Sequence, residues 1–201
     1  MNDAMNDAVN DAGAPLRGLV LTGGHSSRMG QDKALLEVQG VTQLERSVAL
    51  LEAFVDEVYV SVRGDQSAEP VRSRYRQITD QRADFGPAAG ILAAHAYNPD
   101  SAWLVVACDM PLLQPGLLSE LAERRSGIAT AFAGADGQPE PLCAIYEPAI
   151  LHQMQELAEG SGRLSPRSLL SGQGVHLIKS ESSGLLRSAN TQQDMKELSE
   201  L

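Results

Sequence analysis

Residues 18–33 read GLVLTGGHSSRMGQDK, a short apolar run that stops at two glycines and continues into a polar loop. A run of this kind predicts a buried β-strand that enters a tight loop. Glycines let backbone N–H groups approach a phosphate closely, and Arg28 and Lys33 add positive charge. The spacing is neither that of a Walker A loop nor that of GxGxxG, since five residues separate Gly24 from Gly30. We interpret the loop either as a phosphate-binding loop or as a glycine-rich turn with surface charges.

A second loop of interest follows the most apolar run of the chain, residues 103–107. It begins with Cys108 and Asp109. A carboxylate at this point can cap the next helix, or it can bind Mg²⁺, which proteins usually hold with one or two carboxylates and substrate phosphates. Asp80 follows a shorter β-rich run at 77–79 and is interpreted either as part of a surface turn or as a nucleotide contact.

Runs typical of strands alternate with runs typical of helices along the chain. The helix after Thr42 has a clear start, because Glu45 three residues later completes a capping box. Strands are expected at 18–22, 34–38, 58–62, 77–79, 103–107, 128–132, 142–146 and 175–178. Helices are expected from 43 and from 165, and at 87–97, 115–125, 148–159 and 191–201. The alternation predicts a layered α/β domain with a mostly parallel sheet, in which ligands bind beyond the carboxyl ends of the strands.

The composition is that of a globular chain, with 43% hydrophobic and 21% charged residues among 201. Residues 1–14 repeat an Asn-Asp-Ala motif and predict a flexible N-terminal tail, whereas 15–201 predict a single domain. The formal net charge of −10 is unlike the basic footprint of a nucleic-acid-binding protein. We therefore expect a small ligand, or one that arrives with metal ions that cancel its charge.

The sequence also predicts a cytoplasmic location. No apolar stretch approaches the ~18 residues that a membrane span needs, and the N-terminus lacks the basic start and apolar block of a signal peptide. The two cysteines, Cys108 and Cys143, are too few for a disulfide framework and lack the spacing of a metal site. Both are expected to be small core residues.

Three segments together resemble the molybdenum cofactor guanylyltransferase family of the MobA type. They are GLVLTGGHSSRMGQDKALL at 18–36, Asp-Met-Pro at 109–111 and Asn-Thr-Gln-Gln-Asp at 190–194. That family belongs to the nucleotidyltransferases with a three-layer, Rossmann-like α/β domain, and the similarity extends from about Leu16 to the C-terminus. The resemblance implies transfer of GMP from GTP to the terminal phosphate of molybdopterin, with release of pyrophosphate and with Mg²⁺ as cofactor.

The resemblance also implies which residues bind the substrates. Lys33 matches a phosphate-contacting lysine, Asp109 matches the Mg²⁺ ligand, and Asp80 matches a nucleotide-binding aspartate. Further positions around the nucleotide are matched by Leu21, Thr22, Gly23, Gly24, Gly86 and Gly90. Positions near the acceptor are matched by Arg163 and Asn190.

Three positions depart from the pattern of the family. Ser61 is a candidate nucleotide contact, but it stands where the family often has asparagine, which implies a shortened or lost contact. Ser188 stands at the first asparagine of an Asn-Val-Asn-Thr segment, and Glu140 replaces the histidine of a His-Pro pair. The first departure bears on nucleotide selectivity, and the other two bear on the acceptor.

The chemistry implied by the resemblance is compatible with the residues present. A phosphate monoester has a second pKa near 6 and is mostly dianionic at neutral pH, so no general base is required. The reaction then needs positioning, and cancellation of charge on the α-phosphate and the leaving pyrophosphate. We expect Lys33 and Arg28 to act as catalytic cations from one side, and Mg²⁺ on Asp109 to act from the other.

Other functions remain open at this point. The nearest is a cytidylyltransferase acting on the same pterin, or a nucleotidyltransferase using a sugar phosphate, although Asp-Lys-Ala-Leu at 32–35 resembles the guanylyl members more. The second is a non-catalytic carrier that hands the pterin to a target enzyme, against which the presence of both Lys33 and Asp109 argues. The expected partners are GTP and molybdopterin, with transient contacts to cofactor assembly proteins or target enzymes, and neither nucleic acid nor membrane.

Overall fold

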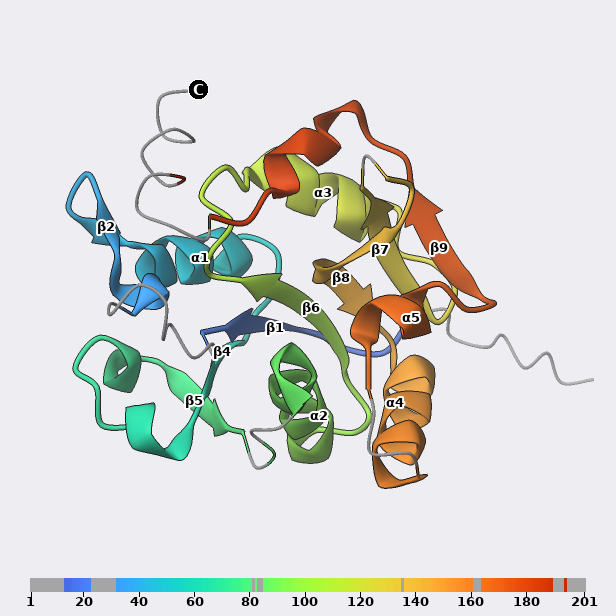
Figure 1. The fold of residues 1–201 in the computed structure, drawn as a ribbon, viewed down its shortest axis with the longest axis horizontal. Helices are drawn as coiled ribbons and strands as arrows, with labels where there is room; N and C mark the ends of the chain where they lie inside the picture. Colours follow the sequence, from blue (N-terminus) through green and yellow to red (C-terminus); the bar gives the residue numbers. More distant parts are fainter. Residues whose placement is uncertain are drawn as a thin grey trace, which may run out of the picture.

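The computed structural model describes residues 13–22, 32–80, 82, 85–134, 136–160, 164–189 and 194. In this part of the chain a seven-stranded sheet runs through the centre, with helices on both of its faces (Figure 1). Its strands are β1 (Leu16–Leu21), β4 (Val58–Val62), β5 (Arg76–Thr79), β6 (Ala102–Ala107), β7 (Ala129–Ala133), β8 (Pro139–Tyr146) and β9 (Val175–Ile178). The α-helices are α1 (Gln43–Glu52), α2 (Pro87–Tyr97), α3 (Pro115–Glu123), α4 (Pro148–Gly160) and α5 (Pro166–Leu170).

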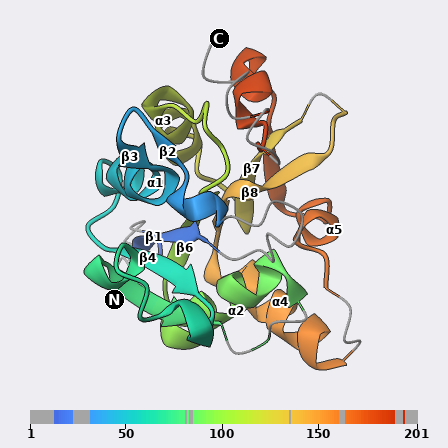
Figure 2. The same ribbon diagram turned by 60° about the vertical axis from the view of Figure 1, so that its left-hand side comes forward.

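A two-stranded hairpin and several short 3₁₀ helices lie outside the central sheet. A hairpin of β2 (Glu37–Val38) and β3 (Val41–Thr42) lies beside α1 (Figure 2). Short 3₁₀ helices are η1 (Lys33–Leu35), η2 (Gly64–Gln66), η3 (Arg72–Arg74) and η5 (Glu181–Leu186). Within the described part of the chain, no helix has both the length and the apolar character to cross a membrane.

The strand order is β5-β4-β1-β6-β8-β7-β9, and every neighbouring pair is parallel except the two pairs that involve β8. Strand β1 lies between β4 and β6, so that Leu21 is paired with Ser61 on one side and with Ala107 on the other. The carboxyl ends of these three strands therefore meet at one edge of the sheet. The mostly parallel α/β sheet expected from the sequence is confirmed, whereas the reversed direction of β8 was not indicated by the sequence pattern.

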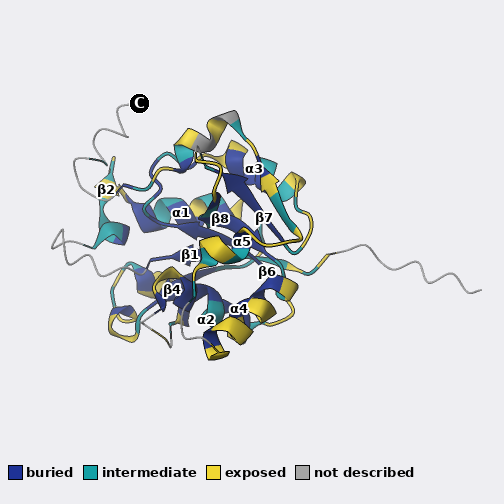
Figure 3. Ribbon diagram, turned by 45° about the vertical axis from the view of Figure 1, so that its right-hand side comes forward, coloured by how far each residue is buried: buried dark blue, intermediate teal, exposed yellow. Residues whose placement is uncertain are grey.

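Two apolar layers fill the space between the sheet and the helices. Helices α1 and α3 cover one face, and α2, α4 and α5 cover the other (Figure 1). The helical side chains of the first layer are Leu44, Val48, Leu51, Leu117, Leu118 and Leu121. Those of the second are Ile91, Ala94, Ile150, Leu151, Met154 and Leu170. Figure 3 shows the result, with buried strands inside and exposed residues on the outer sides of the helices.

Two segments show how local chemistry sets the elements. The capping box of α1 is present as expected, with Thr42 Oγ1 accepting from Glu45 N at 3.1 Å and Glu45 Oε2 accepting from Thr42 N at 3.0 Å. The strand expected at 34–38 was wrong in its first half, because these residues form η1 before β2. The turn after β2 is tight, since Gln39 and Gly40 have φ values of 55° and 80°, which is the left-handed region that such hairpins use.

The ends of the chain are described only in part. The helix expected at 191–201 lies outside the described residues apart from Asp194, and so do residues 1–12 of the expected tail. Ala14, the last residue assigned to that tail, is fixed to the domain, because its carbonyl accepts a 2.7 Å hydrogen bond from Arg125 Nη2.

Helix α2 approaches the sheet most closely at Gly90. A Cβ atom at this position would lie 2.3 Å from Ser61 Oγ and 2.7 Å from Leu21 Cδ2, which are distances that real Cβ atoms do not show. The helix can therefore reach β1 and β4 in this way only with glycine at the contact.

We predict that Gly90→Ala lowers the free energy of unfolding by about 1–3 kcal/mol, because overpacking forces well-fitted neighbours apart. Urea unfolding followed by circular dichroism measures the change. Gly116→Ala in α3 is the matched control, since no heavy atom packs within 4 Å of its added Cβ and alanine is the better helix former. Equal stability of the two variants would contradict the close approach at Gly90.

Candidate active site

Polar side chains gather where the parallel strands end. They are Thr22 after β1, Ser61 near the end of β4, Asp80 after β5 and Asp109 after β6. The backbone ladder continues beyond the strands, because Asp80 N donates to Val62 O at 2.8 Å. This is the edge at which open α/β sheets bind their ligands, so the structure brings the described candidate residues to the expected place.

An ion pair joins the two loops that the sequence singled out. Lys33 Nζ lies 3.4 Å from Asp109 Oδ2, and the two side chains are 24% and 22% exposed. Lys33 is the first residue of η1, whose start is capped by Asp32 Oδ1 accepting from Ala34 N at 3.1 Å. The other carboxylate oxygen, Asp109 Oδ1, is buried and has no hydrogen-bond partner within the described residues. Asp109 thus contacts a cation with one oxygen and retains a second, unsatisfied one.

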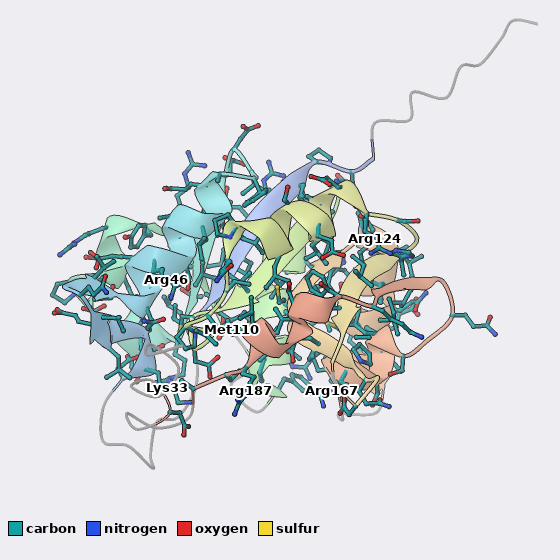
Figure 4. The ribbon with its side chains drawn as sticks, turned by 90° about the horizontal axis from the view of Figure 1, so that it is seen from above. Lys33, Arg46, Met110, Arg124, Arg167 and Arg187 are labelled. Atoms are coloured by element: carbon teal, nitrogen blue, oxygen red, sulfur yellow. The ribbon has the colours of Figure 1, made fainter. Side chains whose placement is uncertain are left out.

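The segment that precedes Asn190 also reaches Asp109. Ala189 N donates a 2.8 Å hydrogen bond to Asp109 O. Arg187 is exposed and belongs to the same segment, and Figure 4 shows Lys33, Arg187 and Arg167 along one edge of the molecule. Cationic side chains from three distant parts of the chain therefore occur along the same edge of a protein whose net charge is −10.

Asp80 is held by Ser61. Ser61 Oγ donates to Asp80 Oδ1 at 2.6 Å. Burial raises the pKa of Asp80, while the hydrogen bond from Ser61 and the positive charge of Arg63 act in the opposite direction. Ser61 is itself only 1% exposed. It therefore presents almost no surface to a ligand and acts on the site through its hydrogen bond to Asp80.

A buried arginine that no sequence motif indicated lies behind Thr22. The side chain of Arg72, in η3, is fully buried. Its Nε donates to Thr22 Oγ1 at 3.3 Å, and its Nη2 donates to Asp32 Oδ1 at 2.9 Å. Thr22 Oγ1 in turn donates to Ser61 O at 2.6 Å. Arg72 thus contacts the residues on both sides of the segment 23–31.

The two glycines of the segment Gly-Pro-Ala-Ala-Gly have structural reasons to be glycine. Gly86 is the N-cap of α2 and has a φ of +55°, a conformation that glycine adopts without steric cost. Gly90, as described above, allows α2 to contact Ser61 and Leu21. The pair therefore sets the approach of α2 to the strand ends, in addition to the proximity to a base that the resemblance implies.

Glu140, one of the departures from the family pattern, also lies at this edge. Strand β8 is antiparallel to β6, with Cys143 paired with Val106; Glu140 precedes Cys143 in β8 and Asp109 follows β6, so both residues lie toward the same end of these strands. Burial raises the pKa of Glu140; a hydrogen bond from Leu142 N and the charge of Arg167 lower it, and the charge of Asp109 raises it further. Arg167 Nη2 lies 3.9 Å from Glu140 Oε2. Glu140 is thus a partly buried carboxylate with a cationic neighbour.

Several candidates cannot be placed. Gly23, Gly24, Arg28, Arg163 and Asn190 lie outside the described residues. Their roles stay predictions from the sequence.

Asp109 is the described residue best suited to bind a divalent cation. Within the described residues, no group of three or more His, Cys, Asp or Glu side chains could hold a metal ion. A single carboxylate fits Mg²⁺ nonetheless, because this ion takes most of its oxygen ligands from phosphates and water. The unpartnered Oδ1 of Asp109 is a suitable donor.

The fold and the strand-end residues match a known family. Residues 18–177, which include all the strand ends of the site, match the MobA-like NTP transferase domain. The chain belongs to this family. It is therefore a nucleotidyltransferase by family, and the three-layer, Rossmann-like nucleotidyltransferase fold expected from the sequence is confirmed.

Individual members of the family give a finer comparison. A molybdenum cofactor biosynthesis bifunctional protein of Synechocystis sp. is 34% identical over 183 residues, 90% of this chain and 52% of that protein, so the chain spans about half its length. A molybdenum cofactor guanylyltransferase of Xanthomonas euvesicatoria pv. vesicatoria is 37% identical over 156 residues, 77% of this chain and 76% of that protein. The crystal structure of molybdopterin-guanine dinucleotide biosynthesis protein A from Archaeoglobus fulgidus matches with a TM-score of 0.73 at 26% identity, covering 92% of this chain and 97% of that one.

We predict that Asp80→Asn stabilises the protein at neutral pH. Burial raises the pKa of Asp80 in the folded state above its unfolded value, so the ionised carboxylate costs stability at higher pH, and the cost disappears as the pH falls through the folded pKa. Asparagine keeps an acceptor for Ser61 and removes the charge. Thermal unfolding should show a higher midpoint for Asp80→Asn at neutral pH and a shrinking difference in mild acid. Asp56→Asn, at an exposed position, is the control, and a gain of the same size there would contradict the assignment.

Proposed function

We propose that this chain transfers GMP from GTP to the terminal phosphate of molybdopterin, with release of pyrophosphate. The observation that carries the proposal is the ion pair between Lys33, at the start of η1, and Asp109, which follows β6. Its support comes from the family to which the chain belongs and from the guanylyltransferase that it resembles at 37% identity.

The residues at the edge suit a reaction that depends on positioning and charge. Phosphoryl transfer offers little covalent chemistry for a protein to perform, and stabilisation of the transition state comes from fixed positive charge. Lys33 is available for this task because it is partly exposed and already oriented toward an anion, Asp109. The acceptor phosphate is mostly dianionic at neutral pH, so the chain needs no general base to activate it.

We propose Mg²⁺ as the cofactor, held by Asp109. When bound, Mg²⁺ supplies positive charge to the phosphates and to the leaving pyrophosphate. The partly exposed side chain and the unpartnered Oδ1 of Asp109 support this assignment. Lys33 contributes a second positive charge. The buried Ser61 holds Asp80, the proposed nucleotide contact, through a hydrogen bond.

We further propose that the reaction takes place in the cytoplasm and that the product passes to assembly proteins or target enzymes through transient contacts. The two cysteines are unpaired and buried, as suits a reducing compartment.

Burial raises the pKa of the Cys108 thiol to about 12, so the thiol is protonated at neutral pH.

We predict that Asp109→Asn and Lys33→Ala each lower turnover by roughly 10²-fold, because each removes a charge that serves the transition state. Pyrophosphate release with GTP, Mg²⁺ and molybdopterin measures the effect. Lys179→Ala removes an exposed lysine after β9 and should leave the rate unchanged. Wild-type turnover in both site variants would remove the proposed site.

We predict that GTP with Mg²⁺ raises the thermal stability more than CTP, UTP or ATP does. A ligand at 100 times its Kd stabilises the native state by about 2.7 kcal/mol, which a thermal shift assay detects readily. A larger shift with CTP would favour a cytidylyltransferase. A shift with GTP without pyrophosphate release, when molybdopterin is present, would favour a carrier.

A further inference from the structure

We propose that Arg72 is a positioning residue. It binds Asp32, which precedes Lys33, and Thr22, which follows β1, and through these contacts it fixes the position of Lys33 relative to the end of β1. The inference rests on the proposed function, in which Lys33 contacts the phosphates. Arg72 belongs to η3, between β4 and β5, and none of the motifs in the sequence includes it.

The contacts of Arg72 converge from three separate segments. Its Nη2 lies 2.8 Å from Asp32 Oδ2 and donates to Asp32 Oδ1 at 2.9 Å. Its Nη1 lies 3.4 Å from Glu69 Oε2, and its Nε donates to Thr22 Oγ1 at 3.3 Å. All three nitrogens of the guanidinium group are therefore used. The guanidinium is fully buried, whereas the side chains of Asp32 and Glu69 are 32% and 21% exposed.

Asp32 connects Arg72 to the 3₁₀ helix η1, which begins with Lys33. One oxygen of Asp32 accepts from Ala34 N at 3.1 Å and so caps η1, and Leu35 N donates to Asp32 O at 3.0 Å. Lys33 lies between these anchored residues, and its Nζ reaches Asp109 at 3.4 Å. A shift of the Asp32 carboxylate would therefore move the turn from which Lys33 projects.

Thr22 connects the same arginine to the strand ends. Thr22 Oγ1 accepts from Arg72 Nε and donates to Ser61 O at 2.6 Å. Ser61 Oγ in turn donates to Asp80 Oδ1 at 2.6 Å. One chain of contacts thus runs from η1, which carries Lys33, through Arg72 and Thr22 to Ser61 and the carboxylate of Asp80. Asp80 follows β5, which lies two strands away from β1 on the side opposite β6.

Only arginine can make this set of contacts. Its planar group offers five donors in a rigid fork, whereas the lysine ammonium is a compact point charge. Burying a guanidinium is costly unless it is paired and hydrogen-bonded, and here Asp32 and Glu69 balance the charge. A purely structural arginine needs such balance as well, but it does not need to bind both residues that flank segment 23–31.

The test compares Arg72→Lys with Arg125→Lys. Arg125 is a matched control, because it also forms a forked pair, with Nε and Nη2 at 2.6 and 2.8 Å from the Glu147 oxygens, and it binds Ala14 O at the opposite edge of the sheet. Thermal unfolding gives the folded fraction of each variant. Per folded molecule, we expect Arg72→Lys to lower kcat for pyrophosphate release by at least about tenfold, since displacement of a catalytic group by about 1 Å can cost 10²-fold. Arg125→Lys should retain the wild-type kcat.

A double variant separates positioning from general loosening. If Arg72 acts through Lys33, Arg72→Lys should lower kcat by less than about twofold in a Lys33→Ala background, because residues that act as a unit are not additive. The full tenfold loss in that background would overturn the proposal. Asp32→Asn, at a side chain 32% exposed, provides a second variant should Arg72→Lys not fold, and it should reproduce the kcat loss.

Amide hydrogen exchange tests the proposal without reference to catalysis. In Arg72→Lys the amides of Ala34 and Leu35 should exchange faster than in the wild type, because their acceptors on Asp32 are no longer fixed, while amides of α1 keep their protection. Unchanged exchange at these two amides would overturn the inference. If instead they exchange faster but the wild-type chain releases no pyrophosphate with any nucleotide and molybdopterin, the positioning contact stands and the proposed function fails.

Discussion

Parallel pairing of β1 with β4 on one side and with β6 on the other is the constraint on which the site depends. In this register Leu21 is level with both Ser61 and Ala107, so the residues that follow each strand emerge together. A slip of one residue would turn every side chain of the strand to the opposite face. Because both faces of these strands are buried under helices, such a slip would exchange side chains between two closely packed layers and disrupt the fit of both. The core therefore holds the strand ends in register.

Two kinds of ion pair share this edge and suit different tasks. In the first, the guanidinium of Arg72 is fully buried, while its partners Asp32 and Glu69 are 32% and 21% exposed. The Lys33–Asp109 pair is roughly one-quarter exposed on both partners. A buried pair is costly to break, since it leaves an uncompensated charge, whereas a partly exposed pair can exchange its partner for a phosphate or a metal ion. In the function proposed above, the first pair fixes the geometry in which the second meets the substrate.

The sequence predicted the mostly parallel α/β architecture and most of the described polar residues at the carboxyl ends of the strands. Apolar runs at 18–22 and 103–107 indicated two strands and the loops that follow them, and the resemblance singled out Lys33 and Asp80. It did not indicate Arg72, because arginines at 72, 74 and 76 have the appearance of an exposed turn and only the packing of η3 buries the first of them. It also placed a strand at 34–38, where a side-chain cap from Asp32 favours a 3₁₀ turn.

What the sequence by itself determined is the set of elements and the family, since hydrophobic periodicity, glycines and a long motif are local properties of the chain. What only the tertiary structure decided is which of these residues meet. Glu140 lies toward the same end of the sheet as Asp109 because β8 runs antiparallel to β6, and Ser61 binds Asp80 because β4 and β5 are neighbours. Strand order and direction arise from contacts between residues far apart in the chain, and no local pattern records them.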